Sequence, residues 1–132
     1  MADFAAVNDI YETMFIKPNP PARVTVACGD NLPKGINVML SVSLDFGPRQ
    51  DRVGLHVQSR SYWAPANIGP YSQAVTVPLR TEGHNASMVF IAGQVPLEPA
   101  SMQRFPDYNL EHHPIIFWAQ TCLALQHLWR GT

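Results

Sequence analysis

Apolar side chains recur every three or four residues in two segments of the chain, and this spacing predicts a helix in each. The first segment, residues 3–15, has Asp3 at the N-cap position and ends before a run of prolines that starts at Pro18. The second, residues 114–130, begins at a proline that suits the first helical position and ends before a glycine. The apolar stripes consist of Phe4, Val7, Ile10 or Tyr11, and Met14 in the first helix, and of Ile115, Trp118 or Ala119, Cys122, Leu125 and Trp129 in the second.

Three other segments alternate between apolar and polar residues, which is typical of strands that bury one face. Two more, residues 72–79 and 86–93, flank the turn at residues 80–85 and predict a strand pair. The alternation is clearest where every second residue from Ile36 to Phe46 is apolar. The predicted strands are residues 22–28, 36–46, 53–60, 72–79 and 86–93. The order of elements predicts an α+β fold in which two helices pack on one face of a largely antiparallel sheet.

Turn-forming residues divide these elements. Residues 47–52 (GPRQDR) combine glycine, proline and three charges, and we interpret them as a linker. Residues 63–70 contain two prolines and predict a rigid loop, and residues 96–113 form a long loop of the kind that is commonly functional. A length of 132 residues with 12 prolines fits a single domain, residues 1–132, built from short elements.

The charge composition narrows the possible functions. Only 14% of the residues are charged, against about 25% in a typical domain, and the net charge is -1. This balance argues against nucleic-acid binding and suggests that part of the surface is buried against copies of the chain. No segment approaches the ~18 apolar residues of a membrane span, and the N-terminus lacks the basic region of a targeting peptide. We therefore expect a cytoplasmic protein without membrane contact.

The residues that could carry metal, redox or nucleotide chemistry do not form known motifs. The two cysteines, Cys28 and Cys122, are far apart, which favours free thiols in a reducing compartment, with a single disulfide as the alternative. None of the five histidines has the spacing of a metal site, although His112 and His113 adjoin. The sequence also lacks phosphate-binding glycine motifs and closely paired carboxylates. We expect no metal and no cofactor.

Three residues are candidates for binding a ligand. Arg23 follows a proline-rich turn, and its planar guanidinium suits a carboxylate, although a surface ion pair is the alternative. Tyr71 directly follows a constrained loop that would aim its ring, or it plugs the sheet edge as a half-buried aromatic. Gly93 ends an apolar strand and would allow close approach of a ligand to its backbone, unless it is simply a turn glycine.

Several stretches of the chain, taken together, resemble the RidA/YjgF family, also called L-PSP endoribonuclease-like proteins. The stretches that look like the N-terminal half of the family are residues 64–74 (APANIGPYSQA), 89–97 (VFIAGQVPL) and 119–128. Those that look like its C-terminal half are residues 1–8 (MADFAAVN), 21–24 (PARV) and 32–35 (LPKG). Residues 59–65 and 125–130 resemble a subgroup, the tandem RidA-like domains of eukaryotic diphthine–ammonia ligases.

The two halves occur in reversed order. Residues 1–46 match the C-terminal half of the family, residues 53–132 match the N-terminal half, and the linker at residues 47–52 marks the seam. Such an order arises in a circularly permuted domain, or in a chain that straddles two tandem domains. One family strand lacks a counterpart, and we expect residues 53–60 or a neighbouring subunit to close the sheet.

The resemblance implies a chorismate mutase-like fold, a homotrimer with clefts between subunits, and hydrolysis of reactive enamines or imines. It implies that Arg23 binds the substrate carboxylate, that Tyr71 lines the cleft and that the backbone of Gly93 contacts the ligand. Three further positions complete the expected site. Ala92 stands where the family often has serine, Thr25 shares the strand face of Arg23, and Ser41 stands where active members have a water-orienting glutamate.

The loss of that glutamate leaves two main hypotheses for function. In the first, the chain forms a trimer whose inter-subunit cleft binds a small carboxylate-bearing ligand and hydrolyses enamines or imines. In the second, it is a catalytically silent binding or assembly module related to the C-terminal domains of diphthine–ammonia ligase. A third hypothesis, endoribonuclease activity, follows only from the older family name, because the sequence offers no basic groove and no paired catalytic histidines.

Overall fold

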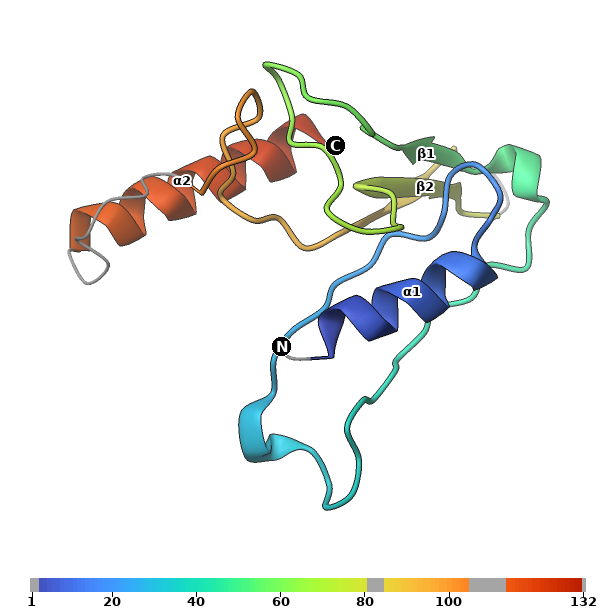
Figure 1. Cartoon of the computed structure of the whole chain (residues 1–132). Helices are drawn as coiled ribbons and strands as arrows, with labels where there is room; N and C mark the ends of the chain where they lie inside the picture. The colour runs from blue at the N-terminus through green and yellow to red at the C-terminus, as the bar shows by residue number, and fades with distance from the viewer. Residues whose placement is uncertain (1–2, 81–84, 105–113, 132) are drawn as a thin grey trace.

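The computed structural model describes residues 3–80, 85–104 and 114–131. Its elements, in chain order, are helix α1 (Phe4–Met14), strands β1 (Val53–Leu55), β2 (Ala74–Pro78) and β3 (Ser87–Ile91), and helix α2 (Pro114–Arg130), as Figure 1 shows. The strands form one antiparallel sheet in the order β1-β2-β3. The α+β class and both predicted helices are therefore confirmed, whereas a chorismate mutase-like topology and a circular permutation are not.

The predictions of strands at residues 22–28 and 36–46 are wrong. Within the first segment only Ala22 makes a β-bridge, parallel to Ser72, and the second segment has no strand pairing. Figure 1 shows the chain between α1 and β1 extending as an open loop away from the sheet. An alternating pattern reports which side chains favour burial, but a strand forms only where a second strand satisfies its backbone groups.

The other three strands are confirmed in shortened form, and the side chain of Gln73 explains where β1 ends. Gln73 Oε1 accepts a hydrogen bond from the backbone N–H of Val57 (2.9 Å), and its Nε2 donates to the Val57 carbonyl (2.9 Å). The same Nε2 lies 3.2 Å from the carbonyl oxygen of Pro65. A side chain thus replaces a neighbouring strand beyond Leu55, so that the ladder stops while the backbone stays satisfied.

The core is small and consists largely of short side chains. Ser72, Ala74 and Ala92 are almost completely buried around the central strand β2. The helices add little to it, since α1 buries no residue and α2 buries only Ile116 and His127. Figure 1 shows α2 extending beyond the sheet and well separated from α1, so the predicted layer of two helices on one sheet face is not confirmed.

Two further expectations concern the thiols and the membrane. Cys28 and Cys122 are both free, as predicted, but neither is buried, because Cys122 is exposed and Cys28 is only partly covered. Within residues 3–80, 85–104 and 114–131, no helix is long and apolar enough to cross a membrane.

The predicted loop at residues 96–113 is described as far as Arg104, which forms a β-bridge with Leu97. The rest of that loop lies outside the described residues.

His127 is buried where α2 meets this loop. Its Nε2 lies 2.8 Å from the carbonyl oxygen of Leu97, and only 3% of the residue is exposed. Because a carbonyl can only accept, Nε2 carries a hydrogen, which leaves Nδ1 as the buried nitrogen without a partner among the described residues. Burial lowers the pKa of His127, and the positive charge of Arg130 acts in the same direction, while the bond to Leu97 opposes them.

These contacts predict that the protein loses stability in mild acid. The pKa of His127 is lower in the folded chain than its ordinary value of 6.5, so the unfolded chain binds more protons between the two values. The free energy of unfolding should therefore be highest above pH 6.5 and fall as the pH drops towards the folded pKa. Chemical denaturation of the wild type and of His127→Gln at a series of pH values measures this slope.

The His127→Gln variant should lose the slope that His127 contributes. The control is Arg130→Gln, which should keep most of it, because burial lowers the pKa of His127 more than the charge of Arg130 does. An unchanged pH dependence in His127→Gln would show that His127 does not cause the acid sensitivity.

Candidate ligand-binding site

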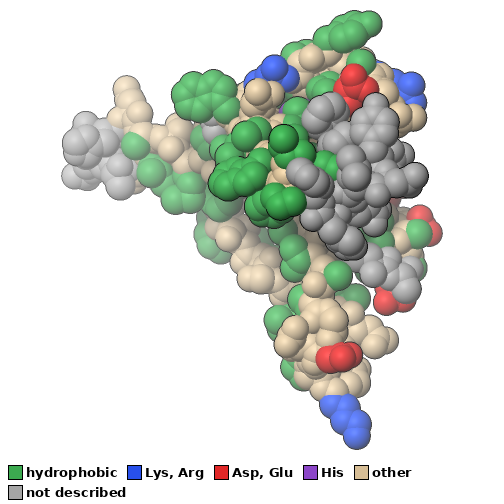
Figure 2. Space-filling model, turned by 90° about the vertical axis from the view of Figure 1, so that its left-hand side faces the viewer, with side chains coloured by type: hydrophobic (Ala, Val, Ile, Leu, Met, Phe, Trp, Pro, Cys, Tyr) green, Lys and Arg blue, Asp and Glu red, His purple; other side chains and the backbone are tan. Residues whose placement is uncertain are grey.

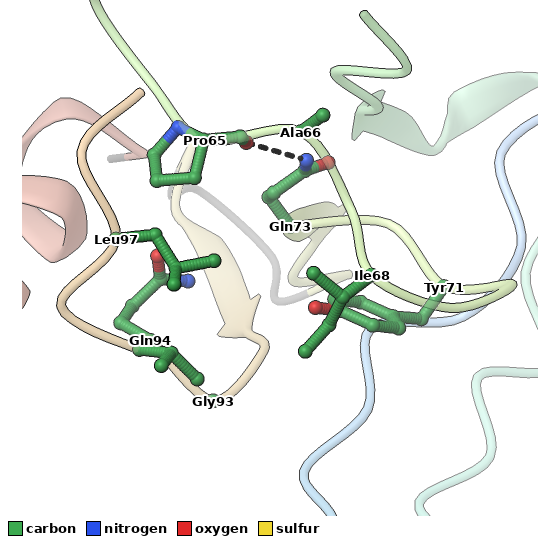
Figure 3. Close-up of a pocket in the computed structure, with 9 residues that line it drawn as sticks. Pro65, Ala66, Ile68, Tyr71, Gln73, Gly93, Gln94 and Leu97 are labelled. Atoms are coloured by element: carbon green, nitrogen blue, oxygen red, sulfur yellow. Dashed lines mark hydrogen bonds between the residues drawn. The ribbon is translucent and has the colours of Figure 1, made fainter. Parts of the chain in front are cut away.

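A small pocket lies between the loop that precedes β2 and the segment that follows β3 (Figure 3). Its cavity volume is only about 20 Å³, and it is open to solvent. Pro65, Ile68, Val95 and Leu97 contribute apolar surface, and its polar groups come from Tyr71 and from two glutamine amides. None of the lining residues carries a carboxylate, an imidazole or a thiol. The pocket therefore has room for only a very small group, and its one titratable lining side chain is the phenol of Tyr71.

Short hydrogen bonds shape the wall of the pocket that carries Tyr71. The carbonyl of Gly69 accepts from the side chain of Asn67 (2.6 Å) and from the backbone N–H of Tyr71 (2.8 Å). Two other lining residues are joined directly, since Gln73 donates a hydrogen bond to the carbonyl of Pro65, as the dashed line in Figure 3 shows. The proline and glycine spacing that predicted a constrained loop at residues 63–70 therefore does fix the direction of Tyr71.

Arg23 lies behind Tyr71, with its guanidinium among three aromatic rings. The guanidinium carbon is 4.6 Å from the ring centre of Tyr11, 5.4 Å from that of Tyr71 and 5.9 Å from that of Phe4. Nη2 donates to the side-chain oxygen of Asn8 (2.6 Å). Nη1 is buried and has no hydrogen-bond partner among the described residues. Such cation–π contacts stabilise the positive charge of Arg23 without neutralising it.

The structure brings Arg23, Tyr71 and Gly93 together. The guanidinium of Arg23 contacts the ring of Tyr71, and the backbone N–H of Gly93 donates to the carbonyl of Arg23 (3.2 Å). Tyr71 and Gly93 both line the pocket. A Cβ atom on Gly93 would lie 3.3 Å from a methyl group of Val24, which indicates a close approach of two backbones at this point.

Of the predicted site residues, only Tyr71 and Gly93 line the pocket, and Arg23 lies outside it together with the other three. Ala92 is buried beside it, and its backbone N–H donates to the carbonyl of Gln73 (2.8 Å). Thr25 and Ser41 are both exposed, in the segments that were predicted as strands, and neither lines the pocket. Without a strand at residues 36–46, the structure offers no sheet position from which Ser41 would face the ligand.

Sequence reasoning missed the residues of α1 that surround Arg23. Phe4, Asn8 and Tyr11 follow one another at spacings of four and three residues, which places them on one helix face. Phe4 and Tyr11 belong to the stripe that predicted burial against a core, whereas Asn8 does not, and in the structure all three contact the guanidinium of Arg23. Burial raises the pKa of Tyr11, although the charge of Arg23 acts against this effect, so the phenol stays protonated at neutral pH.

The part of the chain that the structure describes contains no group of three histidine, cysteine, aspartate or glutamate residues that could hold a metal ion. The histidine pair at 112 and 113 lies outside the described residues. What the site offers chemically is therefore a guanidinium donor beside a small pocket with apolar walls.

Comparison with curated proteins relates almost the whole chain to one class of enzyme. The chain is 39% identical over 127 residues to diphthine–ammonia ligase from Schizosaccharomyces pombe, and 40% identical over 113 residues to that from Saccharomyces cerevisiae. These matches cover 96% and 78% of this chain. A shorter match, 50% identical over 40 residues, relates 30% of the chain to 26% of Protein DfrA from Myxococcus xanthus.

No family profile matches the chain. No solved structure matches it significantly either. Membership of the RidA family therefore remains a hypothesis that rests on the motifs. The chain spans 18% of the length of the Schizosaccharomyces pombe ligase and 16% of the Saccharomyces cerevisiae ligase. It is homologous to a segment of diphthine–ammonia ligases that makes up less than a fifth of those proteins.

Proposed function

We propose that this chain is a binding and assembly module of the kind found within diphthine–ammonia ligases, without catalytic activity of its own. Homology over 96% of the chain supports the relationship, and coverage of only 18% of the relative supports the role of a module. The composition of the pocket supports the absence of catalysis, because its lining residues include no carboxylate or imidazole that would deprotonate water.

We further propose that the ligand is a small carboxylate. The observation that carries this proposal is Nη1 of Arg23, which is buried near the pocket-lining ring of Tyr71 and has no hydrogen-bond partner among the described residues, although Arg23 itself does not line the pocket. A buried donor that makes no hydrogen bond costs free energy, and a carboxylate oxygen would satisfy both the donor and the charge. The small pocket with its apolar walls suits a ligand with a carboxylate and a very short tail.

Propionate should therefore bind, while its neutral analogue propionamide should not. Replacing the guanidinium in Arg23→Gln should weaken propionate binding by about tenfold or more, because a charge-assisted hydrogen bond is lost. The control is Arg49→Gln, which removes the same charge from an exposed arginine that donates to the carbonyl of Pro18. Chemical-shift titration measures the affinity of the wild type, Arg23→Gln and Arg49→Gln for propionate, and of the wild type for propionamide. Equal binding of propionate by the wild type and Arg23→Gln would contradict the proposal.

Hydrolysis of enamines or imines is the second candidate function. The position of Arg23 beside the pocket favours it, since a guanidinium would hold the carboxylate of a dehydroamino acid. The composition of the pocket argues against this hydrolysis. Ser41 is exposed and does not line the pocket, and none of the lining residues supplies a carboxylate in place of the glutamate that active members carry. We therefore regard the silent module as the better-supported function.

An assay of ammonia release from 2-aminoacrylate separates the two candidates. The silent module predicts that wild type and Arg23→Ala both release ammonia at the rate measured without protein. A wild-type rate clearly above that background, and lower in Arg23→Ala, would establish the deaminase function instead.

We also propose that copies of the chain assemble, as a homotrimer, through apolar surface that a single copy leaves exposed. Val38, Leu40, Val42 and Leu44 are each more than half exposed, although they form the most regular apolar alternation in the sequence. Phe117 and Trp118 of α2 are similarly exposed, and Figure 2 shows apolar side chains gathered on one face of the molecule. Exposed apolar surface of this extent is typical of protein interfaces.

Light scattering after size exclusion should therefore give a mass three times the 14.7 kDa of one chain. Leu40→Lys should dissociate the trimer, because it places a charge in the proposed apolar interface. Asn37→Lys adds the same charge at a polar position of the alternation and should leave the mass unchanged. A monodisperse monomer of the wild type would contradict the proposed assembly.

A further inference from the structure

We propose that Asn8 is a positioning residue for Arg23, and that a neutral acceptor is required at this position for the site to bind an anion. The inference rests on the proposed carboxylate-binding function and adds the residue that determines the orientation of the guanidinium. Asn8 lies on α1, and its side-chain oxygen accepts a hydrogen bond of 2.6 Å from Nη2 of Arg23. The bond is partly buried and joins residues that are 15 positions apart in the sequence.

The neighbourhood of this bond leaves the guanidinium little freedom. The rings of Phe4, Tyr11 and Tyr71 lie within 5.9 Å of its central carbon, but rings alone do not fix the direction of individual N–H groups. The hydrogen bond from Asn8 does so, because the guanidinium is planar. With Nη2 engaged, the direction of Nη1 is determined, and Nη1 is the nitrogen that has no partner among the described residues.

Gly69 provides the space for this arrangement. A Cβ atom at this position would lie 3.1 Å from Nη2 of Arg23 and 3.3 Å from both polar atoms of the Asn8 side chain. A side chain at residue 69 would press against the Asn8–Arg23 pair and displace these side chains by a few tenths of an ångström, so glycine favours the close approach of the loop that carries Tyr71. Three separate parts of the chain meet here: α1, the segment after Pro21, and the loop before β2.

The choice of an amide at position 8 has a chemical consequence. An amide oxygen accepts the hydrogen bond without cancelling the positive charge of Arg23, so the guanidinium keeps its attraction for an anion. An aspartate would have nearly the same shape and would accept the same bond, but its charge would neutralise Arg23 from within. Substitutions at position 8 can therefore separate the effect of orienting the guanidinium from the effect of neutralising its charge.

The test compares Asn8→Ala with Asn8→Asp in the full chain, with propionate as the probe. Asn8→Ala should weaken propionate binding about threefold to tenfold, because the guanidinium loses its fixed direction. Asn8→Asp should weaken it about tenfold or more while the chain becomes at least as stable as the wild type, because an internal carboxylate takes the place of the ligand. Ala6→Asp is the matched control, since it adds the same charge at an exposed position of α1 and should bind propionate like the wild type.

A purely structural role for Asn8 would give a different result. Binding would then follow stability, so that Asn8→Asp would bind propionate as well as the wild type, and this outcome would overturn the proposal. A second readout is the NMR shift of the Arg23 side-chain N–H groups, which three nearby rings displace in the wild type. Asn8→Ala should move this shift, and an unchanged shift would also overturn the proposal.

Propionate affinity and the NMR shift of Arg23 test the proposed function and the role of Asn8 separately. If the wild type failed to bind propionate, the carboxylate-binding function would be refuted. The shift of Arg23 in Asn8→Ala would then still decide whether Asn8 positions the guanidinium.

Discussion

The hydrogen bonds of Gln73 are the interaction on which the sheet and the pocket both depend. Its side chain binds the backbone of Val57 through two bonds and reaches Pro65, while its backbone is bonded to Leu55 and Ala92. One residue therefore connects the end of β1, the proline-rich loop and the end of β3. Because the surrounding core consists mainly of small side chains, little apolar burial is available to hold these segments together. Each backbone group left unsatisfied here would cost about 1–3 kcal/mol, which makes a polar contact the dominant local constraint.

A second polar contact, around Arg23, has a similar role for α1. This helix has no buried residue, so its position cannot be explained by packing against a core. Its contacts with the guanidinium through Phe4, Asn8 and Tyr11 are what join it to the pocket loop. The same guanidinium supplies the donor on which the proposed ligand site rests. The placement of the helix and the chemistry of the site are therefore linked through one side chain, and a substitution of Arg23 would affect both.

The exposed apolar surface is the feature that a single copy of the chain does not account for. Residues 36–46 alternate as regularly as any strand, yet their apolar side chains are exposed. Burial of such side chains would stabilise the chain by roughly 25 cal/mol for each Å² removed from water. Homology to a segment of a longer enzyme and the low charge content are both consistent with a module whose surface is completed by contacts beyond one copy. This is why assembly belongs to the proposed function.

The sequence by itself determined the local elements whose signals are complete within a short window. The 3.6-residue periodicity defined both helices, and alternation located β1. The turn at residues 80–85 located β2 and β3, and the glycine and proline spacing indicated the constrained loop before Tyr71. It also selected Arg23, Tyr71 and Gly93, which lie together in the structure. Only the tertiary structure decided that residues 22–28 and 36–46 are not strands, because strand formation requires a partner that periodicity cannot supply. Only the tertiary structure shows that the side chains of Asn8 and Gln73 connect segments that are far apart in the sequence, because hydrogen bonds link Asn8 to Arg23, 15 positions away, and Gln73 to Val57, 16 positions away.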